Sequence, residues 1–154
     1  MTLTPRASLS IASAPLRDLY AYWNERRAGR PMPSRADLDP VDIPRLLPTL
    51  ILFDVEPGTQ RLKARLVGTR IVEMYGNDYT GQYLDEIDFG DRRKAILHDY
   101  MTCYRSRTMY VSEHTFWTTR NVSYRVERLI LPLSDDGETV SMLLSGLDFD
   151  AVVS

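Results

Sequence analysis

Two groups of strand-like segments, separated by a stretch with helical patterns, dominate this sequence. A β-hairpin is predicted over residues 49–55 and 61–67, because Pro57 and Gly58 form a turn signal and the second segment alternates apolar with basic residues. Helices between a hairpin and a three-stranded meander indicate an α+β domain, with one five-stranded antiparallel sheet and helices on one face. The three strands of the meander are predicted over residues 109–118, 124–133 and 139–149.

Helices are predicted where apolar residues recur at the helical period. The middle of the chain favours short helices, the clearest over residues 69–75, and then a longer helix over residues 91–105 that begins at the acidic Asp91. This longer helix is expected to cover one face of the sheet. An N-terminal helix over residues 15–28 carries an apolar stripe formed by Leu16, Leu19, Tyr20 and Trp23.

The 154 residues suit one domain. Prolines recur through residues 31–48 and restrict the backbone, so this segment is expected to be an ordered connector without a long helix. We therefore expect a flexible arm over residues 1–14, a helix and proline-rich connector over residues 15–48, and the main domain over residues 49–150.

Charge and cysteine content argue against several classes of protein. The formal net charge is −2, and no apolar run approaches the roughly 18 residues of a membrane-spanning helix, so neither a nucleic acid nor a membrane partner is expected. Acidic neighbours dilute the basic residues between Arg26 and Arg35, which favours a solvated surface. Cys103 is the only cysteine and the first residues lack the apolar run of a signal peptide, so a cytoplasmic location is expected.

Several segments resemble those of a PAS domain. The sequence runs LVGTRI at residues 66–71 and YGNDYTG at residues 75–81, which is similar to the strand, short helix and glycine-marked loop of that family. Residues 128–133, followed by Asp136 and Gly137, are similar to its fourth strand and next hairpin. The resemblance implies a PAS fold, which serves as a ligand sensor, a dimerisation module or a signal adaptor.

Three N-terminal segments narrow this resemblance. Residues 19–23, 32–35 and 43–48 resemble a group of short bacterial proteins that consist of one PAS domain with a helical N-terminal lead. We expect a signalling protein that contacts a sensor kinase or another regulator. The apolar stripe of the N-terminal helix either pairs with a second copy, which gives a homodimer, or packs within the chain against the connector.

The sequence favours no cofactor. His98 falls on the polar side of its helix, where it would not face a haem. Photoactive flavin binding would need a cysteine within residues 75–81, and Cys103 comes one helix later. Metal-ligand spacing is missing as well, so no metal is expected. A haem or flavin sensor stays an alternative to the signalling interpretation.

Aromatic residues of the helical middle form the candidate ligand-binding site. Ligand pockets are mostly apolar with a few placed polar groups, and tyrosine supplies both. An ordinary core is the competing interpretation. Arg128 lies between apolar residues of a strand, where a charge needs an acidic partner or an anionic ligand. The candidate ligand-binding residues are Tyr75, Tyr79, Tyr83, Tyr100, Tyr104, Phe116 and Arg128.

A small-molecule enzyme of the isomerase or dehydratase type, built on an α+β cup, is the alternative function. It would need a buried acid or base, and only Glu113, His114 and Asp148 are suitable. Glu113 and His114 are adjacent in a strand, so their side chains point to opposite faces. We therefore expect no enzymatic activity.

Overall fold

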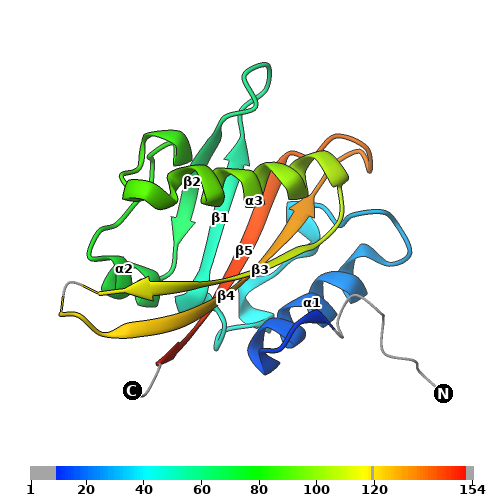
Figure 1. Cartoon of the computed structure of the whole chain (residues 1–154). Helices are drawn as coiled ribbons and strands as arrows, with labels where there is room; N and C mark the ends of the chain where they lie inside the picture. Colours follow the sequence, from blue (N-terminus) through cyan, green and yellow to red (C-terminus); the bar gives the residue numbers. More distant parts are fainter. Residues whose placement is uncertain (1–9, 119, 152–154) are drawn as a thin grey trace.

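The computed structural model describes residues 10–118 and 120–151, which fold around one sheet. Its strands lie in the order β2-β1-β5-β4-β3, and every neighbouring pair is antiparallel (Figure 1). This arrangement confirms the predicted five-stranded antiparallel sheet. The strands are β1 (Leu50–Val55), β2 (Leu62–Val67), β3 (Tyr110–Trp117), β4 (Ser123–Leu133) and β5 (Met142–Ala151).

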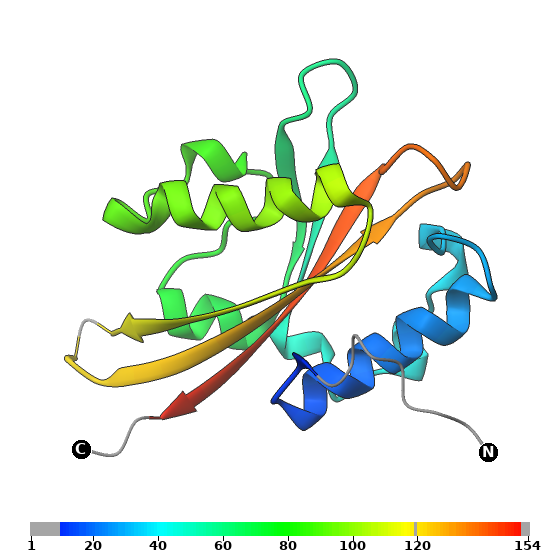
Figure 2. The same ribbon diagram turned by 45° about the vertical axis from the view of Figure 1, so that its right-hand side comes forward.

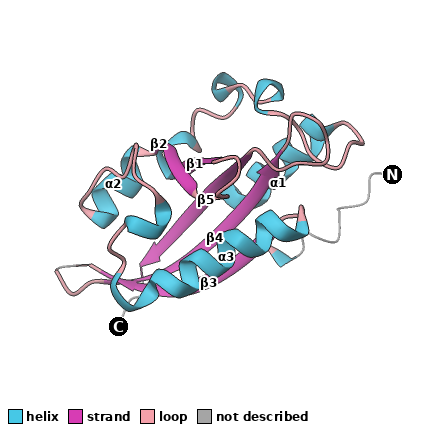
Figure 3. Ribbon diagram, turned by 90° about the horizontal axis from the view of Figure 1, so that it is seen from above, coloured by secondary structure: helices cyan, strands magenta, loops and turns pink. Residues whose placement is uncertain are grey.

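Helices α2 (Thr69–Tyr75) and α3 (Arg93–Ser106) lie on one face of this sheet, and α3 crosses the strands (Figures 1 and 3). Single-turn 3₁₀ helices over Leu84–Glu86 and Gly90–Arg92 connect the two. We call this side of the sheet the α3 face. None of the helices in the described residues is long and apolar enough to cross a membrane.

Helix α1 (Ala14–Arg27) packs on the opposite side, the α1 face (Figure 2). Two successive residues of β5 show this division, because neighbouring side chains of a strand point to opposite faces. The Tyr100 hydroxyl of α3 donates a hydrogen bond of 2.9 Å to the Ser145 hydroxyl. A β-carbon at Gly146 would lie 2.7 Å from Leu19 and 2.9 Å from Leu16 of α1. Glycine therefore permits the close approach of α1 to the sheet.

The apolar stripe of α1 is buried within the chain. Leu16, Leu19, Tyr20 and Trp23 are all buried, and the Trp23 indole Nε1 donates a hydrogen bond of 2.9 Å to the Pro132 carbonyl of β4. The sheet covers the stripe, so its side chains expose almost no area to a second copy. This burial contradicts the dimer contact expected at these four residues. Self-association through another surface stays a prediction.

The expected flexible arm is wrong at its C-terminal end. Ile11 is buried, and the Glu127 carboxylate of β4 accepts hydrogen bonds from the backbone N–H groups of Ala12 and Ser13. The Ser13 hydroxyl also caps α1, because it accepts a backbone N–H of the first turn. These contacts attach the segment before α1 to the sheet. The remainder of the arm, residues 1–9, lies outside the described residues.

The proline-rich connector is ordered and contains no long helix, as predicted. Leu38, Ile43 and Leu46 pack against the core. Proline removes a backbone donor and disfavours helix in the residue before it, so only short turns form. These are single-turn 3₁₀ helices over Arg35–Asp37, Pro40–Asp42 and Leu47–Thr49.

Leu66 departs from the alternation predicted for β2. It pairs with Leu52 of β1, whereas Ala64 pairs with the next residue, Phe53, so the register shifts by one residue. The extra residue in β2 is Arg65, which forms a β-bulge. As a result Ala64 is buried, while Leu66 is 54% exposed.

Two other predicted boundaries are wrong by a few residues. Helix α3 begins at Arg93, because the residues around Asp91 form a 3₁₀ turn instead of its first turn. Strand β5 begins at Met142 rather than at residue 139. The Asp136 carboxylate accepts the backbone N–H of Thr139, which holds that residue in the turn before the strand.

Candidate ligand site

Arg128 of β4 is an almost completely buried charge on the α3 face, with 3% of the residue exposed. Its Nη1 lies 3.4 Å from Oδ2 of Asp99 on α3, and its guanidinium carbon lies 5.6 Å from the centre of the Tyr100 ring. Asp99 is therefore an acidic partner of Arg128, one of the two possibilities that the sequence left open. The long contact to Asp99 satisfies the guanidinium only in part, because Arg128 Nε has no hydrogen-bond partner among the described residues and a buried charge needs hydrogen bonds as well as a counter-charge.

Two polar side chains of β3 lie next to Arg128 on the same face. Ser112 pairs with Arg128 in the β3–β4 register, and His114 pairs with Val126 two residues further along. Ser112 Oγ, His114 Nε2 and Arg128 Nε are buried without a hydrogen-bond partner among the described residues. Buried polar atoms normally have hydrogen-bond partners, so three neighbouring atoms without one mark an unusual site. We call these three residues the polar cluster.

His114 is a neutral imidazole in this environment. Burial lowers its pKa to about 4, and the positive charges of Arg128 and Arg92 contribute to the lowering. A neutral imidazole can donate or accept a hydrogen bond at Nε2, depending on its tautomer. The polar cluster can therefore adapt its donors to a group that enters it.

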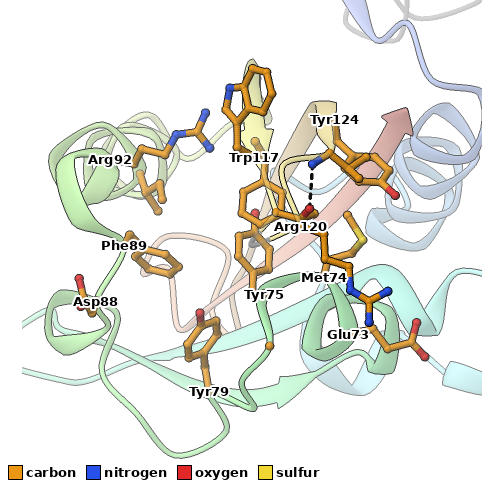
Figure 4. A pocket seen from close by; sticks show the side chains of 15 residues that line it. Glu73, Met74, Tyr75, Tyr79, Asp88, Phe89, Arg92, Trp117, Arg120 and Tyr124 are labelled. Atoms are coloured by element: carbon orange, nitrogen blue, oxygen red, sulfur yellow. Dashed lines mark hydrogen bonds between the residues drawn. The ribbon is translucent and has the colours of Figure 1, made fainter. Parts of the chain in front are cut away.

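An open groove of about 620 Å³ lies at the α2 end of the α3 face (Figure 4). Its walls are aromatic. The Tyr75 ring centre lies 4.6 Å from that of Phe116 and 6.3 Å from that of Phe89, while the Tyr79 and Phe89 centres are 5.6 Å apart. We call it the aromatic groove, and its volume falls in the range of small-molecule sites. Ile96, Trp117 and Tyr124 are among its other lining residues.

A much smaller void of about 20 Å³ lies deeper, against Arg128, Tyr100 and Phe53. Such a void has room for about one water molecule. Tyr75 and Phe89 line both the groove and the void, so their rings form a partition between the two spaces. The interior is thus filled by side chains, and the open space of this face is the groove.

The structure brings together most, but not all, of the predicted ligand-binding residues. Tyr75, Tyr79 and Phe116 line the aromatic groove, and Tyr100 and Arg128 lie at the inner void. The other two predicted residues line neither of these spaces.

Tyr83 belongs to a different surface. Its hydroxyl bonds to the Glu56 carboxylate, and its ring stacks under the Arg61 guanidinium at 3.8 Å. Tyr104 is half-buried on α3 outside the groove. The structure therefore does not bring Tyr83 and Tyr104 together with the other predicted residues.

Several residues that line the groove were not among the predicted ligand-binding residues. The two-residue alternation of strands could have found Tyr124, because it pairs with Phe116 and lies on the same face as Arg128. Arg92 lies in a 3₁₀ turn, where no periodic pattern marks the direction of a side chain. The lining residues that were not predicted include Phe89, Arg92, Ile96, Trp117 and Tyr124.

The residues considered for cofactor chemistry lie away from the groove. His98 is exposed on α3. Cys103 is fully buried, its thiol donates to the Thr108 carbonyl at 3.2 Å, and burial raises its pKa to about 12. A protonated, buried thiol is a poor nucleophile.

The residues considered for enzymatic acid–base chemistry do not converge. His114 faces α3, whereas Glu113 is exposed on the opposite side of β3. Asp148 of β5 lies in a hollow beside α1, lined also by Pro15 and Asp18. No two of the three share a cavity within the described part of the chain.

Solved structures with the same fold are PAS and LOV domains. The LOV protein of Rhodobacter sphaeroides aligns with a TM-score of 0.52 and 11% identity, over 73% of this chain and 68% of that one. The LOV domain of a blue-light activated histidine kinase from Erythrobacter litoralis aligns with a TM-score of 0.51 and 11% identity, over 68% and 96%. A PAS domain from Colwellia psychrerythraea aligns with a TM-score of 0.50 and 8% identity, over 71% and 94%. At these identities the likeness establishes the fold alone.

The interior of this chain does not fit a flavin, the group named for one LOV domain of the same fold. Its space is filled by Phe53, Tyr75 and Tyr100 around a void of about 20 Å³. A flavin ring system needs a slot many times larger. The only cysteine, Cys103, points at backbone carbonyls of Thr108 and Ile130 and lines neither space.

Sequence comparison gives the family directly. No curated protein matches this chain. A family model described as PAS domain matches residues 11–147, which is most of the sequence and includes α1, the helices of the α3 face and the sheet except for the end of β5. The chain therefore belongs to the PAS domain family.

Proposed function

We propose that this chain is a signalling module that binds a small molecule in the aromatic groove and passes its ligand state to a protein partner by surface contact. The observation that carries the proposal is the contrast between the filled interior and the groove of about 620 Å³ with aromatic walls. Membership of a family of sensory and signalling modules supports it. A sensor kinase or another regulator is the proposed partner, since one domain of the same fold belongs to a histidine kinase.

The proposal treats the chain as a binding protein rather than an enzyme. Acid–base catalysis needs a general acid or base that faces the substrate. Of the three residues considered for this role, only His114 lies on the α3 face; its lowered pKa keeps it neutral, and no carboxylate among the described residues forms a hydrogen bond or ion pair with it. We also keep the cytoplasmic location and the homodimer as parts of the proposal, with the contact between copies away from the buried stripe of α1.

Native mass spectrometry of the protein purified from its own host tests the ligand directly. We expect a mass increment that denaturation removes. Phe116→Ser should abolish the increment, because it removes one wall of the groove. Thr115→Ala is the matched control, since this exposed neighbour in β3 points to the other face and should keep the increment. A bare mass for the native protein, or equal increments in both variants, would contradict the proposal.

A further inference from the structure

Arg92 brings an uncompensated charge into the aromatic groove. Its side chain is half-buried, lines the groove and makes no ion pair or hydrogen bond with another described residue. Burial lowers its pKa, and the positive charge of Arg128 contributes to the lowering, which places the two guanidinium groups within each other's field. Two like charges in a partly dry site destabilise the fold unless an anion offsets them.

The groove and the polar cluster carry a net positive charge of one. Asp99 offsets Arg128, and Glu73 at the groove rim pairs with Arg70 at 3.4 Å. Asp88 at the rim is exposed and accepts a hydrogen bond from the Gly90 backbone N–H. His114 is neutral. The groove and the polar cluster, together with the ion-pair partners Arg70 and Asp99, hold four arginines against three carboxylates: Arg70, Arg92, Arg120 and Arg128, against Glu73, Asp88 and Asp99.

The polar cluster offers hydrogen-bond donors that the fold leaves unused. Arg128 Nε can only donate, and the Ser112 hydroxyl and the His114 imidazole can each donate once. All three atoms are buried and unsatisfied among the described residues. Burial raises the pKa of the Tyr75 phenol, whereas the positive charges of Arg128 and Arg92 act to lower it, so both guanidinium groups lie within electrostatic reach of this hydroxyl.

We propose that this site binds a monoanionic organic acid, with its carboxylate at Arg92 and its flat apolar body between the rings of the aromatic groove. The inference rests on the proposed function, since it names the chemical class of the ligand of that same groove. A single net positive charge suits one carboxylate better than a dianionic phosphate. Arginine matches the planar, two-oxygen geometry of a carboxylate, and the aromatic walls suit an aromatic or flat alicyclic body.

The Tyr75 ring limits how far a ligand in the groove can reach toward Arg128. Its ring lines both the groove and the inner void, so a carboxylate at Arg92 can reach the Nε atom of Arg128 only if the Tyr75 ring turns away. That movement would change the packing at the end of α2, because Tyr75 is the last residue of the helix. Ligand binding is thereby coupled to a surface helix that a partner can contact.

Isothermal titration with a matched pair of probes tests the charge requirement. The probes are 2-naphthylacetate and 2-naphthylacetamide, which share the ring system and differ in charge. We expect the intact chain to bind the acid at least tenfold more tightly than the amide. Arg92→Gln should remove most of this difference by weakening the acid about tenfold, and Arg92→Lys should restore part of it.

Lys94→Gln is the matched control. It removes one positive charge from an exposed position on α3 that lines neither space, so both affinities should change less than twofold. Equal affinities of acid and amide would overturn the anion proposal and leave the groove as a ligand site. Binding of neither probe would count against the proposed function as well. If Arg92→Gln fails to fold by circular dichroism, the comparison of acid and amide on the intact chain decides alone.

Discussion

The two faces of the sheet are built from the same strands and differ in how completely they are closed. On the α1 face, Leu16 and Leu19 press against Gly146, and the Trp23 indole has its hydrogen bond to Pro132. On the α3 face, the ion pair of Arg128 with Asp99 is long, and the Arg128 Nε atom has no hydrogen-bond partner among the described residues. One face satisfies its side chains within the chain, whereas the other leaves charge, donors and space unused.

This difference separates stability from function. Apolar burial on the α1 face stabilises the fold because it removes surface from water, and among the described residues no buried side-chain nitrogen or oxygen on this face lacks a hydrogen-bond partner. A site for a ligand must keep groups whose partners are absent until the ligand arrives, and this costs stability. The α3 face shows that cost in its polar cluster, so substitutions on the two faces should have different consequences.

The largest effect is expected on the closed face. Leu19→Ala deletes a fully buried side chain of α1 and should lower the free energy of unfolding by about 3 kcal/mol. Leu66→Ala is the control, because this exposed leucine should cost less than about 0.5 kcal/mol. Urea denaturation followed by circular dichroism measures both. A loss below about 1 kcal/mol for Leu19→Ala would show that α1 does not close this face.

The buried ion pair should give the next largest effect. Asp99→Ala leaves Arg128 charged and buried, which should lower the free energy of unfolding by about 2–3 kcal/mol, less than for an ideal pair because the contact is long. Replacing both partners, as Asp99→Leu with Arg128→Met, should recover most of the loss. If the double variant is as unstable as the single one, Asp99 does not act through Arg128.

His114 should produce a smaller, pH-dependent effect. Its pKa is about 4 in the fold, below the roughly 6.5 of an unfolded histidine. The unfolded state therefore binds the proton first as the pH falls, and stability decreases between about pH 6.5 and 4. His114→Gln should lack this part of the pH dependence, whereas the exposed His98→Gln should retain it. Identical profiles for the parent and His114→Gln would contradict the assigned burial.

The smallest effect is expected at Cys103. Burial raises the pKa of this thiol to about 12, so the native protein should react with iodoacetamide no faster than it unfolds. In urea the same thiol should react within minutes, as followed by mass spectrometry. Rapid labelling of the folded protein would show that the packing between α3 and β4 opens readily.

The sheet and its helices could be predicted because their signals are local. The alternation in β2, the stripe at Leu16 and Trp23, and the turn around Asp136 each act within a few residues of sequence. The bulge that exposes Leu66 could not be predicted, since it depends on the register with β1.

The candidate site was only partly predictable for the same reason. Tyr75 and Phe116 were identified from their residue types, but their contact joins α2 to β3 across the fold. Arg92 enters the groove from an irregular turn, and the polar cluster arises from the β3–β4 register. Sequence patterns locate the elements, whereas the unsatisfied atoms appear only when the elements are packed.

Amide chemical-shift mapping tests most directly whether ligands bind on the α3 face. Uniformly ¹⁵N-labelled protein is titrated with 2-naphthylacetate. We predict the largest shifts in the lining residues of the groove within 73–96, 116–118 and 120–124, and in the polar cluster of Ser112, His114 and Arg128, with little change in residues 14–27 of α1. Largest shifts in α1, or in the connector around Leu47, would contradict this prediction.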